Sequence, residues 1–316
     1  DLLRQVKIQT GEEMRVTVGE LIGYLYNLQS DSGRALSEYL LVEAKKSNLV
    51  LLEISVLVHS YRFYDFNMQI SNLRAAAALA RSEELFTDLA AAYEFMAVVF
   101  RDNAQADSAL LYALAAKDLL EEYKPDDDLH HVLQIVADMH FYAGEYDQAT
   151  DIYKRILHEL PKDVKHWRYI TLNNNLGLIN FAQNRYEQAA HYFLMADSIL
   201  LTGHIRLGDS IGMIYTSRKL MELYIVTKNP EKAQLYCSRG LAITNKIKEY
   251  ADLSGLIIGQ GKIFLLQGKP KEAYPQLLKG EKMESNGNNI SLRASLYEGL
   301  AEYYRLSGDY RSSSAY

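Results

Sequence analysis

The sequence predicts an all-α fold in which about seven antiparallel helix pairs stack into a solenoid. Three observations lead to this prediction. One motif recurs about every 40 residues from residue 89 onward, and helix-forming residues dominate the composition. Runs of alternating β-branched residues, which are typical of strands, do not occur. No change in composition marks a boundary, so one domain is expected to span residues 1–316.

The composition narrows the class of protein. Of the 316 residues, 48% are apolar and 23% are charged, and the mean hydropathy is −0.18. These values are those of a globular protein, and no apolar run is long enough for a membrane span within this segment. The net charge is −6 and no basic stripe occurs, so direct contact with nucleic acid is not expected. Cys237 is the single cysteine, and the compartment, cytoplasmic or periplasmic, stays open.

The repeated motif consists of a turn residue, an aromatic residue or proline, a small residue, and two further packing positions. One copy is Gly144, Tyr146, Ala149, Tyr153 and Ile156. The small residues at positions 108, 149, 189, 233, 273 and 313 lie 41, 40, 44, 40 and 40 residues apart. Weaker copies lie around Ala35 and Ser71, so residues 1–80 are expected to form degenerate repeats, and residues 89–316 clear ones.

Each small residue is preceded by another contact position twelve residues earlier. It is occupied by Gly23, Met96, Ala137, Gly177, Met221, Gly261 and Ala301. Two antiparallel helices approach closely where facing side chains are small, and a turn of about three residues joins them. These positions are therefore predicted to be where the two helices of each pair touch, with Gly177 at the closest approach.

Several residues are expected to mark helix ends. Asp163 and Asp209 are predicted N-caps, and Pro125 and Pro161 lie between units, where proline is tolerated. Residues 201–210 are expected to be the longest connection and to account for the 44-residue spacing. The chain stops at Tyr316, within the predicted second helix of the last unit, so the protein is expected to continue.

The stretches LGLINFAQNRYEQAAHYFLMA and ADMHFYAGEYDQATDIYKRIL resemble the tetratricopeptide repeat (TPR) family. The resemblance covers nearly the whole chain, although residues 1–80 match weakly. It implies a right-handed superhelical solenoid that exposes the first helix of each pair on its concave side. The family period is 34 residues, so units of about 40 residues imply helices longer by about one turn.

No motif for catalysis or cofactor binding is present. Phosphate-binding glycine loops, nucleophile elbows and zinc motifs are missing, so no catalytic residue, cofactor or metal site is predicted. Residues 126–128 with His130 and His131 are metal-ligand types, but neighbouring helical residues point in different directions, which favours helix capping. His140 is interpreted as a packed, hydrogen-bonded histidine and Cys237 as a buried, inert thiol.

Candidate ligand contacts follow from the register of the first helices. Asparagine is a poor helix former, so at least one residue in 173–175 is expected to bond either a ligand or a neighbouring helix. A generic solvated surface is the alternative interpretation of this whole face. The predicted concave-face residues are Tyr93, Arg101, Gln134, Asp138, Tyr142, Asn174, Phe181, Arg218, Glu222 and Lys262, followed by Glu298, Glu302 and Arg305.

The resemblance implies a non-enzymatic module that binds a protein or peptide. The long units and the open end resemble the input or sensor segments of bacterial regulatory proteins. A structural scaffold that assembles a complex through its convex face or its ends is the alternative. In the peptide-binding interpretation, Asn174 bonds the peptide backbone, Arg218 pairs with an acidic group and Tyr142 supplies apolar contact. A clamp for a chaperone C-terminus is not expected, because Asp138 would repel a carboxylate.

Overall fold

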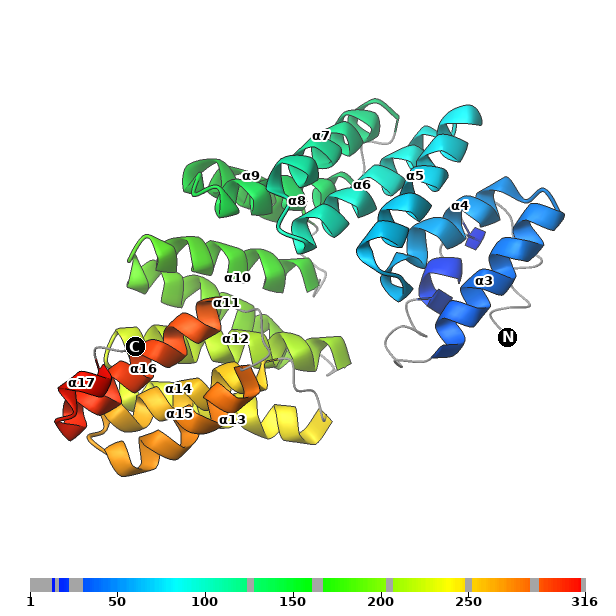
Figure 1. Cartoon of the computed structure of the whole chain (residues 1–316). Coiled ribbons are helices and arrows are strands. Elements are labelled where there is room, and N and C mark those ends of the chain that lie inside the picture. Colours follow the sequence, from blue (N-terminus) through cyan, green and yellow to red (C-terminus); the bar gives the residue numbers. More distant parts are fainter. Residues whose placement is uncertain are drawn as a thin grey trace. The chain divides into compact units, whose positions relative to one another are not determined.

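The computed structural model describes residues 13–14, 17–22, 31–123, 128–160, 167–202, 207–247, 252–284 and 290–313. Within these residues every regular element is a helix and no strand occurs (Figure 1). The predicted all-α fold is therefore confirmed. The chain divides into two compact units, unit 1 (Asp1–His158) and unit 2 (Glu159–Tyr316). The single continuous solenoid over residues 1–316 stays a prediction.

The helices follow one another along the chain in both units. Those of unit 1 are α3 (Asp31–Lys46), α4 (Val50–His59), a 3₁₀ helix (Tyr61–Phe63), α5 (Phe66–Ser82), α6 (Phe86–Asp102), α7 (Ala106–Tyr123), α8 (Asp128–Tyr142) and α9 (Tyr146–Glu159). Those of unit 2 are α10 (Trp167–Ala182), α11 (Tyr186–Thr202), α12 (Leu207–Val226), α13 (Pro230–Ile247), α14 (Leu253–Leu266), α15 (Pro270–Glu284), α16 (Ile290–Ser307) and α17 (Tyr310–Ser313). After α3, these described helices form seven consecutive pairs, from α4/α5 to α16/α17.

Three-residue turns join the helices of most pairs, as the motif predicted. In each turn one residue adopts a left-handed backbone, for example Gly144 with φ 78° and Gly268 with φ 70°. The residue after it closes the helix end: the Glu145 amide donates to the His140 carbonyl at 2.8 Å, and the Lys269 amide donates to the Phe264 carbonyl at 2.8 Å. These bonds occupy carbonyls that the end of a helix leaves without partners, which makes a sharp reversal of the chain possible.

The predicted contact positions are confirmed where glycines occupy them. A Cβ atom added to Gly177 would lie 2.5 Å from Cε1 of Phe193 in the partner helix. A Cβ atom on Gly261 would lie 2.8 Å from Cγ of Leu277. Both spacings are shorter than van der Waals contact, so the helices of α10/α11 and α14/α15 approach to a distance that only glycine allows.

Two predictions about helix ends are wrong. Helix α12 begins at Leu207, so Asp209 lies in its first turn and is not the N-cap. Only residues 203–206 separate α11 from α12, fewer than the 161–166 segment before α10, so 201–210 is not the longest connection. The extra length of this repeat is helical instead, because α12 has 20 residues.

Some expectations fall on residues outside those described, namely Gly23, Pro125, Asp126, Asp127, Pro161 and Asp163.

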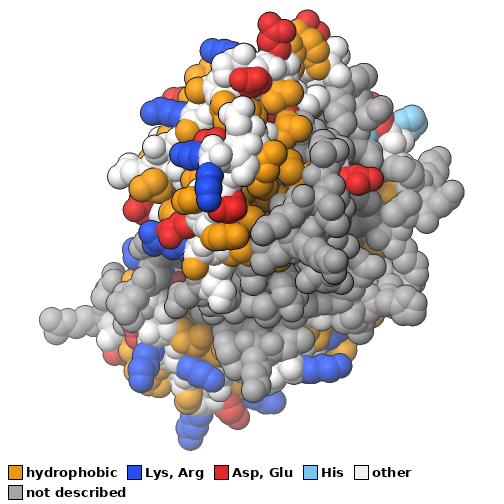
Figure 2. Space-filling model, turned by 90° about the vertical axis from the view of Figure 1, so that its right-hand side faces the viewer, with side chains coloured by type: hydrophobic (Ala, Val, Ile, Leu, Met, Phe, Trp, Pro, Cys, Tyr) orange, Lys and Arg blue, Asp and Glu red, His pale blue; other side chains and the backbone are white. Residues whose placement is uncertain are grey.

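None of the helices in the described ranges combines the length and the apolar character needed to cross a membrane. On the face shown in Figure 2, basic and acidic side chains are interspersed with apolar ones.

Candidate functional site

In unit 1, polar side chains connect two successive first helices, α6 and α8. Nδ1 of His131 in α8 pairs with Oε1 of Glu94 in α6, and Nη1 of Arg101 lies 3.3 Å from Oδ2 of Asp138. Glu94 and Arg101 are seven residues apart, as are His131 and Asp138, so each pair of positions falls on one stripe of its helix. We call the surface formed by Glu94, Arg101, His131, Asp138 and Tyr142 the α6/α8 face.

Asp138 is a largely enclosed carboxylate of the α6/α8 face, with a side chain that is 16% exposed. Burial raises its pKa above the ordinary value, although Tyr153 and Arg101 act in the opposite direction. The Tyr153 hydroxyl, from the second helix α9, donates to Oδ1 of Asp138 at 2.5 Å. Asp138 therefore ties α8 both to its own partner helix and to the preceding first helix.

Tyr142 and Gln134 lie in α8 but take no part in the two side-chain pairs that link α6 to α8. The Tyr142 side chain is 70% exposed at the end of α8, one turn after Asp138. Its pKa is raised by partial burial of the phenol and by the nearby Asp138 carboxylate. Gln134, one turn before Asp138, is 8% exposed, and its Oε1 accepts no hydrogen bond from any described residue. An apolar surface and an unused acceptor thus flank the Arg101–Asp138 pair.

In unit 2, the first helices α10, α12, α14 and α16 are also connected by polar side chains. Nδ2 of Asn174 donates to Oγ1 of Thr216 at 3.0 Å, which links α10 to α12. Nζ of Lys262 donates to Oγ of Ser295 at 3.1 Å and to Oε2 of Glu298 at 3.0 Å, which links α14 to α16. For residues 173–175, the neighbouring-helix alternative therefore holds for Asn174, whereas Asn173 bonds the Tyr169 carbonyl of its own helix.

Arg218 links α12 to the start of α14. Its Nε donates to Oδ1 of Asp252 at 2.7 Å and its Nη1 donates to Oε1 of Glu222 at 2.5 Å. Burial alone would raise the pKa of Glu222, but Arg218 and Lys219 hold this pKa below its ordinary value. Arg218 is 9% exposed, so its guanidinium acts first as a clamp within unit 2.

The remaining predicted residues lie elsewhere in the helix pairs. Tyr93 packs against Tyr112 of its partner helix α7, with ring centroids 5.6 Å apart, and Phe181 packs against Tyr186 at 5.7 Å. Glu302 and Arg305 pair with each other at 2.6 Å on the exposed surface of α16. The structure therefore does not bring Tyr93 and Phe181 together with the polar contacts of the first helices.

The sequence analysis did not identify several residues that take part in these contacts. Glu94 lies seven residues before Arg101, on the same side of α6, and this spacing is the signal that could have identified it. Asp252 precedes α14 and meets Arg218 from 34 residues away, and Thr216 meets Asn174 from 42 residues away. Nothing local in the sequence indicates these last two contacts.

The residues interpreted as structural have structural partners. Nδ1 of His140 lies 2.6 Å from Oε2 of Glu145, the residue that closes the turn, and the imidazole is half-buried. Cys237 is buried, and burial raises the pKa of its thiol to about 12, as expected for an inert cysteine. Among the described residues, no cluster of three or more His, Cys, Asp or Glu side chains is arranged to hold a metal ion.

Solved structures share the TPR-like fold of this chain. Aspartyl phosphate phosphatase F from Bacillus subtilis is similar with a TM-score of 0.68 and 16% identity, covering 99% of this chain and 84% of that chain. The apo form of the quorum sensor NprR from B. thuringiensis is similar with a TM-score of 0.64 and 17% identity, covering 99% and 88%. The Rap conjugation gene regulator of the plasmid pLS20, in complex with the Phr* peptide, is similar with a TM-score of 0.63 and 19% identity, covering 86% and 73%. No protein-family model and no curated protein matches the sequence.

Proposed function

We propose that this chain is a non-enzymatic module that binds a protein segment or peptide and serves as the input segment of a regulatory protein. Two of the similar structures are a quorum sensor and a conjugation regulator bound to a peptide, and they share the fold at 17% and 19% identity. A third is named as a phosphatase, so the non-enzymatic character is part of the proposal. The polar and aromatic surface on the first helices supports binding of an extended chain.

The α6/α8 face is the part of the first helices that fits this function best. Tyr142, which is 70% exposed, carries the proposal, because it offers a rigid aromatic surface at low entropic cost. Beside it, Arg101 and Asp138 provide donors and an acceptor that stay in place through their mutual bond. A peptide can contact the ring of Tyr142 and hydrogen-bond to this pair without displacing it.

The roles expected for Asn174 and Arg218 are different in this proposal. Their polar groups bond Thr216 in one case and Glu222 and Asp252 in the other. They shape the first-helix surface of unit 2 and hold neighbouring pairs together. Lys262 and Glu298 provide the more accessible polar pair of that unit, since the Glu298 side chain is 71% exposed.

The proposal is tested by screening the whole chain against an array of random hexapeptides. Tyr142→Ala is expected to weaken the selected peptides about tenfold or more, as truncation of an aromatic anchor does. Tyr39→Ala is the matched control, because Tyr39 is an exposed tyrosine on α3, away from the α6/α8 face. Equal affinities of Tyr142→Ala and the wild type would exclude this face as the binding site, and the absence of any selected peptide would favour the scaffold interpretation.

Enzymatic activity is tested separately with acetyl phosphate as a small acyl phosphate. No release of phosphate above the uncatalysed rate is expected from the purified chain. Hydrolysis that follows saturation kinetics would contradict the non-enzymatic part of the proposal and leave the binding experiment unaffected.

A further inference from the structure

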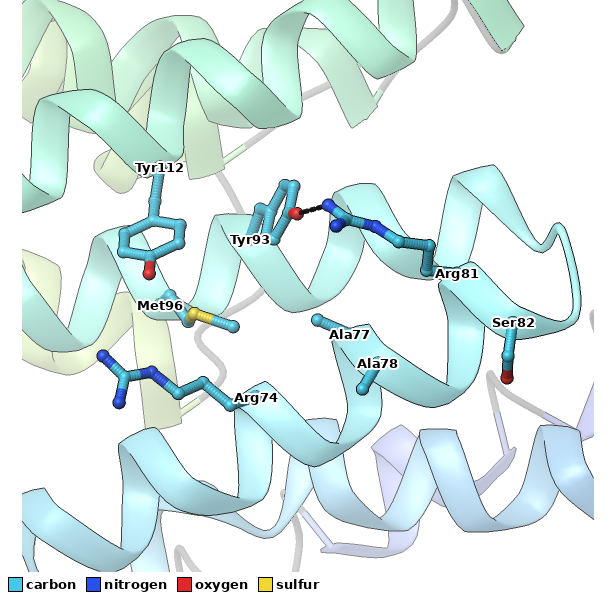
Figure 3. Close-up of a pocket in the computed structure, with 8 residues that line it drawn as sticks. All are labelled: Arg74, Ala77, Ala78, Arg81, Ser82, Tyr93, Met96 and Tyr112. Carbon is cyan, nitrogen blue, oxygen red and sulfur yellow. Dashed lines mark hydrogen bonds between the residues drawn. The ribbon is translucent and has the colours of Figure 1, made fainter.

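A groove in unit 1, which shares no residue with the α6/α8 face, lies between α5 and the helix pair α6/α7. Two adjoining pockets form it, with volumes of about 480 and 340 Å³, and both are lined by Arg74. No Asp or Glu lines either pocket. The larger pocket is lined by Arg74, Ala77, Ala78, Arg81, Ser82, Tyr93, Met96 and Tyr112 (Figure 3).

The α5 wall of this groove carries two exposed arginines. Arg74 and Arg81 are seven residues apart, so they lie on one side of α5 and about 10 Å apart along its axis. Figure 3 shows the Arg81 guanidinium turned toward the Tyr93 hydroxyl, to which it donates a hydrogen bond, and Arg74 extended below Tyr112. Among the described residues, no carboxylate lies within ion-pair distance of either arginine. By contrast, the less exposed Arg101, Arg218 and Arg239 each pair with an acid.

Aromatic rings from α6 and α7 lie opposite the arginines. The rings of Tyr93 and Tyr112 lie 5.6 Å apart, and Tyr112 stacks on Phe100 at 5.4 Å. Phe66, which begins α5 itself, meets Phe100 edge-on at 5.9 Å. Met96, which is 1% exposed, lies between the arginines and this aromatic row. The groove thus presents two cations on one wall and the half-buried rings of Tyr93 and Tyr112 on the other, with the buried Met96 and Phe100 behind them.

We propose that this groove binds an extended acidic peptide segment in which two carboxylates flank an apolar side chain. The two guanidinium groups would each pair with a carboxylate, and the aromatic row would contact the side chain between them. In an extended chain, residues i, i+2 and i+4 point to one face and span about 13 Å. The flexible arginine side chains can reach carboxylates at that spacing. This site goes beyond the peptide site on the first helices and shares no residue with the α6/α8 face.

The test uses a fluorescein-labelled peptide with the core Glu-Ala-Leu-Ala-Glu and the whole chain, followed by fluorescence anisotropy. The wild type is expected to bind it more tightly at low salt than at high salt, because the arginines are exposed and their charges are screened. Peptides with Gln-Ala-Leu-Ala-Gln or Glu-Ala-Ser-Ala-Glu cores should bind about tenfold more weakly, since each lacks one of the two recognised groups.

Variants of the chain locate the site. Arg74→Gln and Arg81→Gln should each weaken binding of the acidic peptide about tenfold, with circular dichroism and the melting temperature unchanged. Arg293→Gln is the matched control, because Arg293 is exposed on α16 and its substitution removes the same charge from unit 2. Tyr142→Ala should bind the acidic peptide as the wild type does, which separates this site from the proposed function.

Three results would overturn the assignment. The first is absence of binding by the wild type up to about 1 mM peptide, the weak limit of specific recognition. The second is equal affinity of the Arg74→Gln, Arg81→Gln double variant and the Arg293→Gln control. The third is equal affinity of the wild type for the acidic peptide and its Gln-substituted form.

Discussion

At the scale of single residues, the close approach of paired helices depends on the absence of a side chain. Gly177 faces the ring of Phe193, and the space for a Cβ atom is already filled. Phe193 is itself 1% exposed, so its ring cannot move outward without disturbing the packing of α10 against α11.

Gly177→Ala is therefore expected to destabilise the protein by about 1–3 kcal/mol, and Gly177→Leu by at least as much, through overpacking. Gly212→Ala is the control, because a Cβ atom there would lie 3.5 Å from Leu200, which is ordinary contact. In that helix interior, alanine should stabilise by about 0.5–1 kcal/mol. Urea denaturation measures both changes, and equal midpoints for the two variants would contradict the assigned contact.

His59 makes stability dependent on pH. Its imidazole packs edge-on against Phe95 with centroids 5.6 Å apart, and burial lowers its pKa from 6.5 to about 4. The imidazole binds a proton more readily in the unfolded chain than in the folded one. The contribution of neutral His59 to the free energy of unfolding is therefore fully present above pH 6.5 and is lost as the pH falls toward 4.

For His59, the loss between neutral pH and pH 4 is expected to approach about 3 kcal/mol. His59→Gln removes this titration, so its unfolding free energy should depend less on pH than that of the wild type. His191→Gln, which removes an exposed histidine of α11, is the matched control. Parallel pH profiles of all three proteins would show that His59 is not responsible.

At the scale of elements, the turns between paired helices share one backbone geometry but not one residue type. Glycine occupies the left-handed position in the turns at Gly144 and Gly268, whereas Ala104 adopts φ 57° and Lys228 adopts φ 54°. A residue with a Cβ atom is strained in this conformation. Replacing glycine by alanine at such a position should therefore lower stability, and replacing alanine by glycine should raise it.

Gly268→Ala is expected to destabilise by about 1 kcal/mol, because no atom lies within 4 Å of the added Cβ and only backbone strain opposes it. Ala104→Gly should stabilise by several tenths of a kcal/mol to about 1 kcal/mol, since relief of strain exceeds the added entropy of the unfolded chain. Thermal unfolding compares the two. Destabilisation by both substitutions would mean that Ala104 is not strained.

At the scale of the whole molecule, a solenoid transmits stability from pair to pair through neighbouring interfaces. The prediction of one solenoid over residues 1–316 implies that unit 1 and unit 2 unfold together. The chain has a single tryptophan, Trp167, which opens α10 in unit 2 and serves as a local reporter.

Leu73→Ala tests this coupling. Leu73 is fully buried in α5 of unit 1, and its truncation should cost about 2–5 kcal/mol. In one cooperative solenoid, the fluorescence of Trp167 and the helical circular dichroism shift to lower denaturant by the same amount. An unchanged fluorescence midpoint with a shifted dichroism midpoint would show that the two units unfold independently.

The sequence by itself determined the helical class, the pairing of helices and the positions where paired helices touch. These features depend on spacings of a few residues to about a dozen, so the 3.6-residue period and the short turns encode them directly. Gly177 against Phe193 and the turn at Gly144 were predictable for this reason. The sequence also placed Arg101, Asp138 and Arg218 on first helices.

Only the tertiary structure decided which groups these residues meet. Arg101 with Asp138, Asn174 with Thr216 and Lys262 with Glu298 are contacts across 36 to 42 residues. The same is true of the groove in which Arg74 and Arg81 face the aromatic row of the neighbouring pair. Periodicity states which face of a helix a side chain occupies, but its partner depends on the rotation and shift between successive pairs. That geometry results from the packing of all the side chains at each interface, so no local pattern encodes it.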